Sequence, residues 1–366
     1  MKKLSLYILL LWAIPLFGNW PEFRGGQHLP GRTNASIPQK VTMAWSFKTG
    51  SEIKSSPVVW GGRIVVGSTD NYVYCLDLKG TLLWSFKTTN AVEAPALIRN
   101  NKVYVGDLSG MFYALDLHTG KQVWKFEANN QFSGSANWFR DRTGREFIIA
   151  GSYDFFLYCL EAKTGKLMWR YEAQNYLHTT PALWNGHAVF GGCDGLLHVV
   201  NLTNGSLLDT VSVATYIASA AAIDNHKAYI GDYDGKFSCI DLRTRKIVWS
   251  FDRESRKLPF IGSPVVVGNR VLIGNRDRFV YCLNKETGKV LWQRNTGNPV
   301  ESSPIADSRN VLISNMRGDL MLLSLQNGDV VWTFELGSAV QGSPAIIPNH
   351  IIVGAKDGNI YCLKSS

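Results

Sequence analysis

TGKLMWRY, at residues 164–171, joins a Thr-Gly turn to an apolar strand that carries a Trp. The same phrase recurs at residues 119–126 and 287–292, and looser copies recur along the chain. The steps between successive Trp residues are 39, 40, 45, 80, 43 and 40 residues. These residues are Trp45, Trp84, Trp124, Trp169, Trp249, Trp292 and Trp332. A period of about 40 residues is typical of a repeat protein.

The double step between Trp169 and Trp249 contains one altered copy of the phrase. Residues 204–209 read NGSLLD and place Asp209 where the other copies have Trp. We therefore expect the joint between the fourth and fifth repeats to differ from the others and to be packed more loosely.

Each repeat contains four short segments with strand character. In the first repeat these are residues 56–60, 63–67, 72–77 and 82–86, and turn residues separate them. Four short runs of this kind predict an antiparallel meander sheet. Because one such sheet cannot bury both of its faces, copies must stack, and radial stacking gives a β-propeller.

The number of blades follows from the first strand of each repeat. These strands are expected to begin at Ser56, Ala94, Ser135, Thr180, Ala220, Ser263, Ser303 and Ser343. The last repeat has only three strands, whereas a spare strand at residues 42–47 precedes the first repeat. The sequence thus predicts an all-β, eight-bladed β-propeller of four-stranded antiparallel blades, with the N-terminal strand closing the last blade and removing the exposed sheet edges.

The seven Trp residues are interpreted as structural. A large planar side chain on the outer strand can dock over the turn of a neighbouring blade, where Thr-Gly leaves room for it. A side chain that recurs in one structural position is more easily explained by packing than by cofactor binding or base stacking.

The N-terminus precedes the repeats. Residues 1–18 contain Lys2 and Lys3 before an apolar run and predict a signal peptide. Residues 19–40 form an N-terminal extension, and residues 41–366 form the propeller. We expect an exported monomer without a transmembrane segment, either extracellular or periplasmic, with peripheral contact to the outer membrane as a further option. Removal of Lys2 and Lys3 lowers the formal net charge from +9 to +7. This charge favours acidic partners or anionic surfaces, but 18% charged residues is too dilute for a nucleic-acid binder.

The repeat x-Asp-x-x-Thr-Gly-Lys-x-x-Trp resembles the quinoprotein (PQQ-like) propeller repeat. The opening WPEFRGG at residues 20–26 is similar to the segment before the propeller in many exported bacterial members. The family includes dehydrogenases that use pyrroloquinoline quinone (PQQ) and also scaffolds without chemistry, such as the BamB-type factors of outer-membrane assembly. The chain lacks the Cys-Cys pair and calcium-binding carboxylates of the dehydrogenases, and it lacks the N-terminal Cys that anchors BamB.

No catalytic or metal-binding residue is predicted. Five of the six Cys occupy one position of the third strand, where other repeats have Ala, Val or Leu, so this position is a small apolar packing site. Cys193 lies in a turn between two strands and lacks the strand-to-helix context of a nucleophile. We expect no cofactor, with PQQ and Ca²⁺ as the alternative.

The loops after each outer strand and those between second and third strands must emerge on one face. This face is predicted to carry an aromatic arc, made of Phe132, Tyr153, Phe155, Tyr176, Tyr216 and Tyr233. Beside it we expect a basic arc, made of Arg253, Arg256, Lys257, Arg276, Arg278 and Arg317. Exposed aromatic and Arg side chains are typical of protein-binding hot spots, although the same residues could simply pack their own loops.

A second candidate site lies at the mouth of the central channel. Lys54, His178, Glu301 and Gln341 are expected to line it and could hold a small polar ligand. The favoured interpretation is an exported, non-catalytic scaffold that binds protein partners, in BamB-like envelope assembly. The alternative is an enzyme or sensor that binds PQQ or a sugar at the channel mouth.

Overall fold

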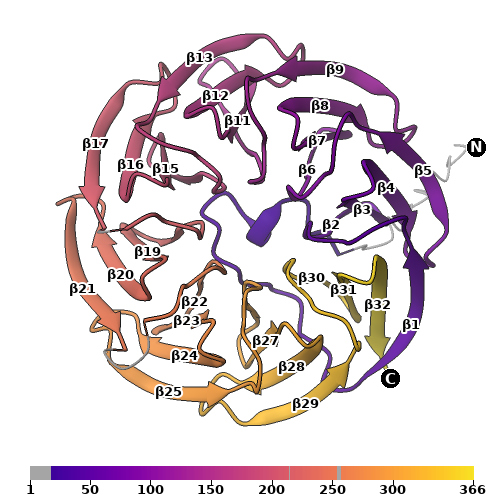
Figure 1. Cartoon of the computed structure of the whole chain (residues 1–366), viewed down its shortest axis with the longest axis vertical. Coiled ribbons are helices and arrows are strands. Elements are labelled where there is room, and N and C mark those ends of the chain that lie inside the picture. The colour runs from indigo at the N-terminus through magenta and orange to yellow at the C-terminus, as the bar shows by residue number, and fades with distance from the viewer. Residues whose placement is uncertain (1–17, 214, 254–256) are drawn as a thin grey trace, which may run out of the picture.

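The computed structural model describes residues 18–213, 215–253 and 257–366. Their 32 strands form eight four-stranded antiparallel sheets arranged as blades around a central axis (Figure 1). The predicted signal peptide lies outside the described residues, apart from Gly18. No helix in the described ranges is long and apolar enough to cross a membrane.

Blades 1 to 4 each consist of four consecutive strands. Blade 1 contains β2 (Val58–Trp60), β3 (Arg63–Ser68), β4 (Tyr72–Asp77) and β5 (Leu82–Lys87). Blade 2 contains β6 (Leu97–Arg99), β7 (Lys102–Gly106), β8 (Met111–Asp116) and β9 (Gln122–Glu127). Blade 3 contains β10 (Asn137–Arg140), β11 (Glu146–Gly151), β12 (Phe156–Glu161) and β13 (Leu167–Glu172). Blade 4 contains β14 (Ala182–Trp184), β15 (His187–Gly191), β16 (Leu196–Asn201) and β17 (Leu207–Ser212).

Blades 5 to 7 repeat this order, and blade 8 joins the two ends of the propeller. Blade 5 contains β18 (Ala222–Asp224), β19 (Lys227–Gly231), β20 (Lys236–Asp241) and β21 (Lys246–Asp252). Blade 6 contains β22 (Val265–Val267), β23 (Arg270–Gly274), β24 (Phe279–Asn284) and β25 (Val290–Asn295). Blade 7 contains β26 (Ile305–Ala306), β27 (Asn310–Ser314), β28 (Asp319–Ser324) and β29 (Val330–Glu335). Blade 8 contains β30 (Ala345–Ile347), β31 (His350–Gly354), β32 (Asn359–Ser365) and β1 (Val41–Lys48).

The predicted fold, blade number and closure are confirmed. Strand β1 pairs antiparallel with β32, from Val41 opposite Ser365 to Lys48 opposite Asn359. The inner strands begin two or three residues later than predicted, because the residues before them join neighbouring blades instead. For example, the backbone N–H of Ser263 donates to the Ser303 hydroxyl at 2.9 Å.

Strand direction defines two faces. In blades 1 to 7 the turns between first and second strands and between third and fourth strands lie at one end, here called the lower face. At this face Leu202 N–H of one turn donates to Gly186 O of the other at 3.0 Å. The remaining loops meet at the upper face, where Tyr153 N–H donates to Gln131 O at 3.0 Å.

The Trp residues dock between blades as predicted. The indole N–H of Trp84 in blade 1 donates to Leu117 O in blade 2 at 2.9 Å. The ring covers Gly120, where an added Cβ would lie 2.6 Å from Trp84 Cδ2. Trp332 instead donates to Pro38 O at 2.9 Å, because the outer strand of blade 8 comes from the N-terminus.

An ion pair replaces this contact at the joint between blades 4 and 5. Arg245 stands where the other turns have Gly and has a φ of 57°. Its guanidinium lies 3.1 Å from the Asp209 carboxylate, and both side chains are exposed. The joint therefore differs from the others as expected, because Asp209 replaces the Trp and Arg245 replaces the Gly.

Restoring the standard pair should strengthen this joint. We expect the double variant Asp209→Trp/Arg245→Gly to unfold with a free energy about 1–2 kcal/mol above the native chain, because a docked Trp contributes more than an exposed ion pair. Asp209→Trp alone should gain little, since its ring would meet the Arg245 side chain. Urea unfolding of the native chain, the two single variants and the double variant measures the coupling between the two positions. If the changes in unfolding free energy of the single variants add up to that of the double variant within about 0.5 kcal/mol, the coupling is refuted.

The N-terminal extension fills the channel from the lower side. Residues 19–33, here called the plug, include η1 (Phe23–Gly25) and run across the centre of the propeller (Figure 1). Arg24 in the plug is buried and donates to Pro264 O and Pro304 O, both at 2.6 Å. Burial lowers the pKa of this guanidinium to about 9.

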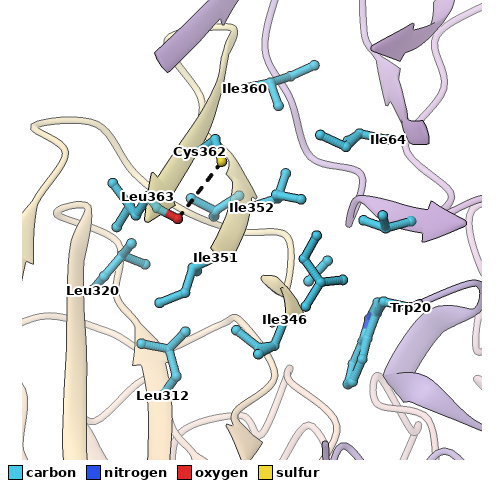
Figure 2. Packing of buried hydrophobic residues seen from close by; sticks show 14 of the residues in the cluster. Trp20, Ile64, Leu312, Leu320, Ile346, Ile351, Ile352, Ile360, Cys362 and Leu363 are labelled. Atoms are coloured by element: carbon cyan, nitrogen blue, oxygen red, sulfur yellow. Dashed lines mark hydrogen bonds between the residues drawn. The ribbon is translucent and has the colours of Figure 1, made fainter. Parts of the chain in front are cut away.

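The plug also joins the hydrophobic core. Trp20 is buried where blades 7, 8 and 1 meet (Figure 2). The same cluster contains Ile64, Leu312, Leu320, Ile346, Ile351, Ile352, Ile360, Cys362 and Leu363. The five Cys of the third strands are buried and unpaired, and burial raises the pKa of the Cys75 thiol to about 12. These thiols act as apolar packing groups.

Candidate interaction surface

One position of the upper face has the same backbone conformation in every blade. The last residue of the turn between the second and third strands has a positive φ. Five blades have Gly there, namely Gly110, Gly195, Gly235, Gly318 and Gly358, and blade 1 has Asn71. Blade 3 instead has Phe155, with a φ of 77°, and blade 6 has Arg278, with a φ of 75°.

These two residues are strained. A left-handed conformation costs a residue with a Cβ roughly 1–2 kcal/mol, and large side chains seldom adopt it. Both side chains are exposed at the upper face, Phe155 in the aromatic arc and Arg278 in the basic arc. The molecule therefore tolerates strain at two positions where Gly would serve the fold better.

Five of the six predicted aromatic side chains lie at the upper face, in two groups of contacting rings. Tyr153 and Phe155 each lie beside Tyr176, with ring centroids 5.1 and 5.2 Å apart. Tyr216 stacks on Tyr233, with centroids 4.3 Å apart. Phe155, Tyr176 and Tyr216 are exposed, so the arc presents apolar surface to solvent.

The assignment of Phe132 to this surface is wrong. Its side chain is 0% exposed and packs against Phe112 and over Gly106 in blade 2. The equivalent loop residues Val92 and Leu177 are buried in the same way. Aligning the loops would have shown an apolar anchor at this position in every one of these blades.

Some side chains of the basic arc are held by close hydrogen bonds or ion pairs, and the others project into solvent. Arg253 lies 2.9 Å from the Tyr281 hydroxyl and 3.4 Å from Asp277, and Arg276 lies 2.8 Å from Glu301. Lys257 and Arg278 are exposed. Arg317 is also exposed, with looser ion pairs to Asp319 at 3.8 Å and Glu335 at 3.4 Å. Arg256 lies outside the described residues.

The channel-mouth residues are brought together as predicted. Lys54, His178, Glu301 and Gln341 line a shallow pocket of about 170 Å³, with Phe23 of the plug also in its lining. Lys54 pairs with Glu93 at 2.7 Å and Glu301 pairs with Arg276. Pockets for small organic ligands are roughly 300–1,000 Å³, so this mouth is small for such a ligand.

Cys193 and His178 also meet near the mouth. The Cys193 sulfur lies 3.5 Å from His178 Nδ1. Burial and the Asp194 carboxylate raise the pKa of the Cys193 thiol, whereas burial lowers the pKa of His178 to about 4. Both shifts favour the neutral forms, which is the opposite of what an activated thiolate nucleophile needs.

The mouth does not fit PQQ with Ca²⁺. Within the described ranges, no three His, Cys, Asp or Glu side chains are clustered as a metal site. The carboxylate of Glu301 is engaged by Arg276, and the plug occupies the axis below. Both carboxylates in the lining, Glu93 and Glu301, are thus paired with cations, and a pocket of about 170 Å³ is small for a three-ring quinone.

The repeat resemblance is supported by a family comparison. The sequence model of the family described as outer membrane protein assembly factor BamB matches residues 42–156 and 154–366. The chain belongs to this family of PQQ-like repeat propellers. No curated protein matches the sequence.

Solved structures show the same architecture. BamB from Moraxella catarrhalis aligns with a TM-score of 0.75 and 17% identity, over 89% of this chain and 100% of that one. A europium-containing methanol dehydrogenase aligns with a TM-score of 0.79 and 13% identity, over 95% of this chain and 98% of that one. The computationally designed Ika8 protein aligns with a TM-score of 0.75 and 18% identity, over 87% of this chain and 97% of that one. At such identities these likenesses show the fold alone.

Proposed function

We propose that this protein is a non-catalytic scaffold that binds an acidic protein partner through its upper face. The strained residues Phe155 and Arg278 carry this proposal. Strain that the fold does not require is typical of functional positions, because selection for binding can offset a loss of stability.

The chemistry of the face agrees with protein binding. Aromatic and Arg side chains dominate binding hot spots because they bury large areas at a small entropic cost. Exposed rings of Phe155, Tyr176 and Tyr216 would supply the apolar contacts. The projecting charges of Lys257, Arg278 and Arg317 would select acidic side chains on the partner.

The family supports a proposal for where this activity takes place. We infer that the protein works as a monomer after export, in the periplasm or outside the cell, and assists envelope assembly as its BamB-type relatives are named for doing. The upper face would then dock a component of the assembly machinery. A role as an enzyme or sensor at the channel mouth is less well supported, because that pocket is small and its carboxylates are paired.

The Arg278 turn gives the test of this function. We expect Arg278→Gly to unfold with a free energy about 1 kcal/mol above that of Arg278→Ala, because only Gly relieves the left-handed strain. Both variants should capture less of the partner than the native chain does, since both lack the guanidinium. Urea unfolding measures the first effect, and quantitative affinity capture from envelope extract of the native host measures the second.

Asn71→Gly is the matched control, because it changes the same turn position in blade 1, away from both arcs. It should leave capture unchanged. Full capture by both Arg278 variants would contradict the proposed binding surface, and equal stability of the Gly and Ala variants would contradict the argument from strain.

A further inference from the structure

A cavity of about 900 Å³ opens on the lower face between blades 3 and 4. Its size lies within the range of small-molecule sites, roughly 300–1,000 Å³. It is lined by turns of both blades and by Gln27 and His28 of the plug. It lies on the face opposite the aromatic and basic arcs, so it is separate from the proposed partner surface.

The cavity exists because blade 3 departs from the repeat. In blade 1 the first two strands are joined by Gly61 and Gly62, whereas in blade 3 residues 141–145 separate β10 from β11. This longer hairpin accounts for part of the 45-residue step between Trp124 and Trp169. It projects at the lower face and forms one wall, with Asn185, Gly186 and Thr203 of blade 4 also in the lining.

Aromatic side chains make up much of the lining. Phe139 and Phe147 stack with ring centroids 5.0 Å apart. The indole N–H of Trp138 is held by Glu22 at 3.1 Å, and the Arg99 guanidinium lies 3.5 Å from the centroid of the Trp138 ring. These contacts fix the walls before any ligand arrives, which lowers the entropic cost of binding.

The rim carries three guanidinium groups from the same hairpin. Arg140 pairs with Glu146 at 2.7 Å, and Arg145 pairs with Asp141 at 3.0 Å. Arg142 is exposed and has no carboxylate within 4.0 Å among the residues that the structure describes. One cationic group is therefore available beside an aromatic cavity.

We propose that this cavity binds a small amphipathic anion, a ring system that carries one carboxylate, sulfonate or similar group. The ring system would lie against Phe139, Trp169 and Trp184, and the anion would accept hydrogen bonds from Arg142. A guanidinium presents several N–H donors in a planar fork, which suits such a group. The two parts of the ligand correspond to the two parts of the site.

A matched pair of fluorescent probes separates these two parts. We expect 8-anilinonaphthalene-1-sulfonate to bind at one saturable site, with N-phenyl-1-naphthylamine, which has the same rings without the sulfonate, about tenfold weaker. Arg142→Ala should weaken sulfonate binding about tenfold and leave the neutral probe unchanged. Arg243→Ala, which removes an exposed Arg from the lower face of blade 5, should change neither.

A blocking variant tests the location. Thr203 lies on the rim and is exposed, so Thr203→Trp should fill the cavity mouth without disturbing the fold, which circular dichroism and thermal unfolding verify. Loss of both probes in this variant would support the site. Unchanged binding of both probes, or binding that does not saturate, would overturn the proposal, and an unchanged ratio of the two affinities in Arg142→Ala would overturn the role of the anion.

Discussion

A chain that begins at Asn34, and so lacks the plug, is expected to lose about 5 kcal/mol or more of unfolding free energy relative to a chain that begins at Asn19. Eight backbone hydrogen bonds join the plug to inner strands of six blades. They are those between Trp20 and Val59 in both directions, and those from Ile98 to Pro21, Leu183 to Gln27, Ile223 to His28, Val266 to Pro30, Ala306 to Gly31 and Thr33 to Ala306. Each such bond contributes about 1 kcal/mol net.

Side chains add to this effect and partly oppose it. Trp20 and Leu29 are buried in two separate core clusters, and burial of one large apolar side chain contributes about 1.5–3 kcal/mol. Arg24 acts in the other direction, because none of the carboxylates that the structure describes pairs with this buried cation, and an unpaired buried cation is costly. The lowered pKa of this residue indicates the same cost. We expect a loss of unfolding free energy smaller than the sum of these contributions, because water would enter the emptied channel and form hydrogen bonds with some of the backbone groups that the plug no longer pairs.

Urea unfolding of the two chains measures this loss. A synthetic peptide with the sequence of residues 19–33, added to the shortened chain, should raise its unfolding midpoint by mass action. A scrambled peptide of the same composition is the control. Equal midpoints for the two chains would show that the plug only occupies the channel and does not hold the blades together.

The sequence was sufficient for the architecture but not for the plug. Strand alternation and the recurring Trp are local signals, and each is repeated up to eight times, so errors in one copy are corrected by the others. The segment 19–33 has no repeat, and its partners lie in blades far away along the chain. Its path depends on tertiary pairing, for which the WPEFRGG stretch gave no local pattern.

The candidate surface was predictable in outline and not in detail. Exposed rings such as Tyr176 were found because the loops that carry them must share one face. Phe132 was misassigned, since loop position alone does not distinguish an outward ring from a buried anchor. The strain at Phe155 and Arg278 could have been inferred by aligning the turns, because six other blades have Gly or Asn there. The cavity between blades 3 and 4 arises from the extra residues of the hairpin at 141–145. A repeat pattern describes what the blades share and therefore does not predict a feature of one blade.

Replacing Trp84 with Ala is expected to lower the unfolding free energy by about 3–5 kcal/mol. The indole is 8% exposed, donates to Leu117 O and covers Gly120, so its removal leaves a cavity between blades 1 and 2. Leu83→Ala, at the neighbouring residue, is the control. Leu83 is 44% exposed and should cost about 1 kcal/mol or less. Equal losses for the two variants in urea unfolding would contradict the structural role of the Trp.

The Gly beneath the indole offers a second view of the same contact. Gly120→Ala should also destabilise the chain, because the new Cβ would lie 2.6 Å from Trp84 Cδ2 and φ is +69°. Without the indole only the backbone strain remains, so the loss in the double variant Trp84→Ala/Gly120→Ala should be smaller than the sum of the two single losses by about 1 kcal/mol or more. If the two single losses of unfolding free energy simply added in the double variant, Gly120 would be needed only for the conformation of its turn and not for the contact with Trp84. A positive coupling would show that the Trp and the Thr-Gly turn act as one unit, which explains why Asp209 and Arg245 differ together at the joint between blades 4 and 5.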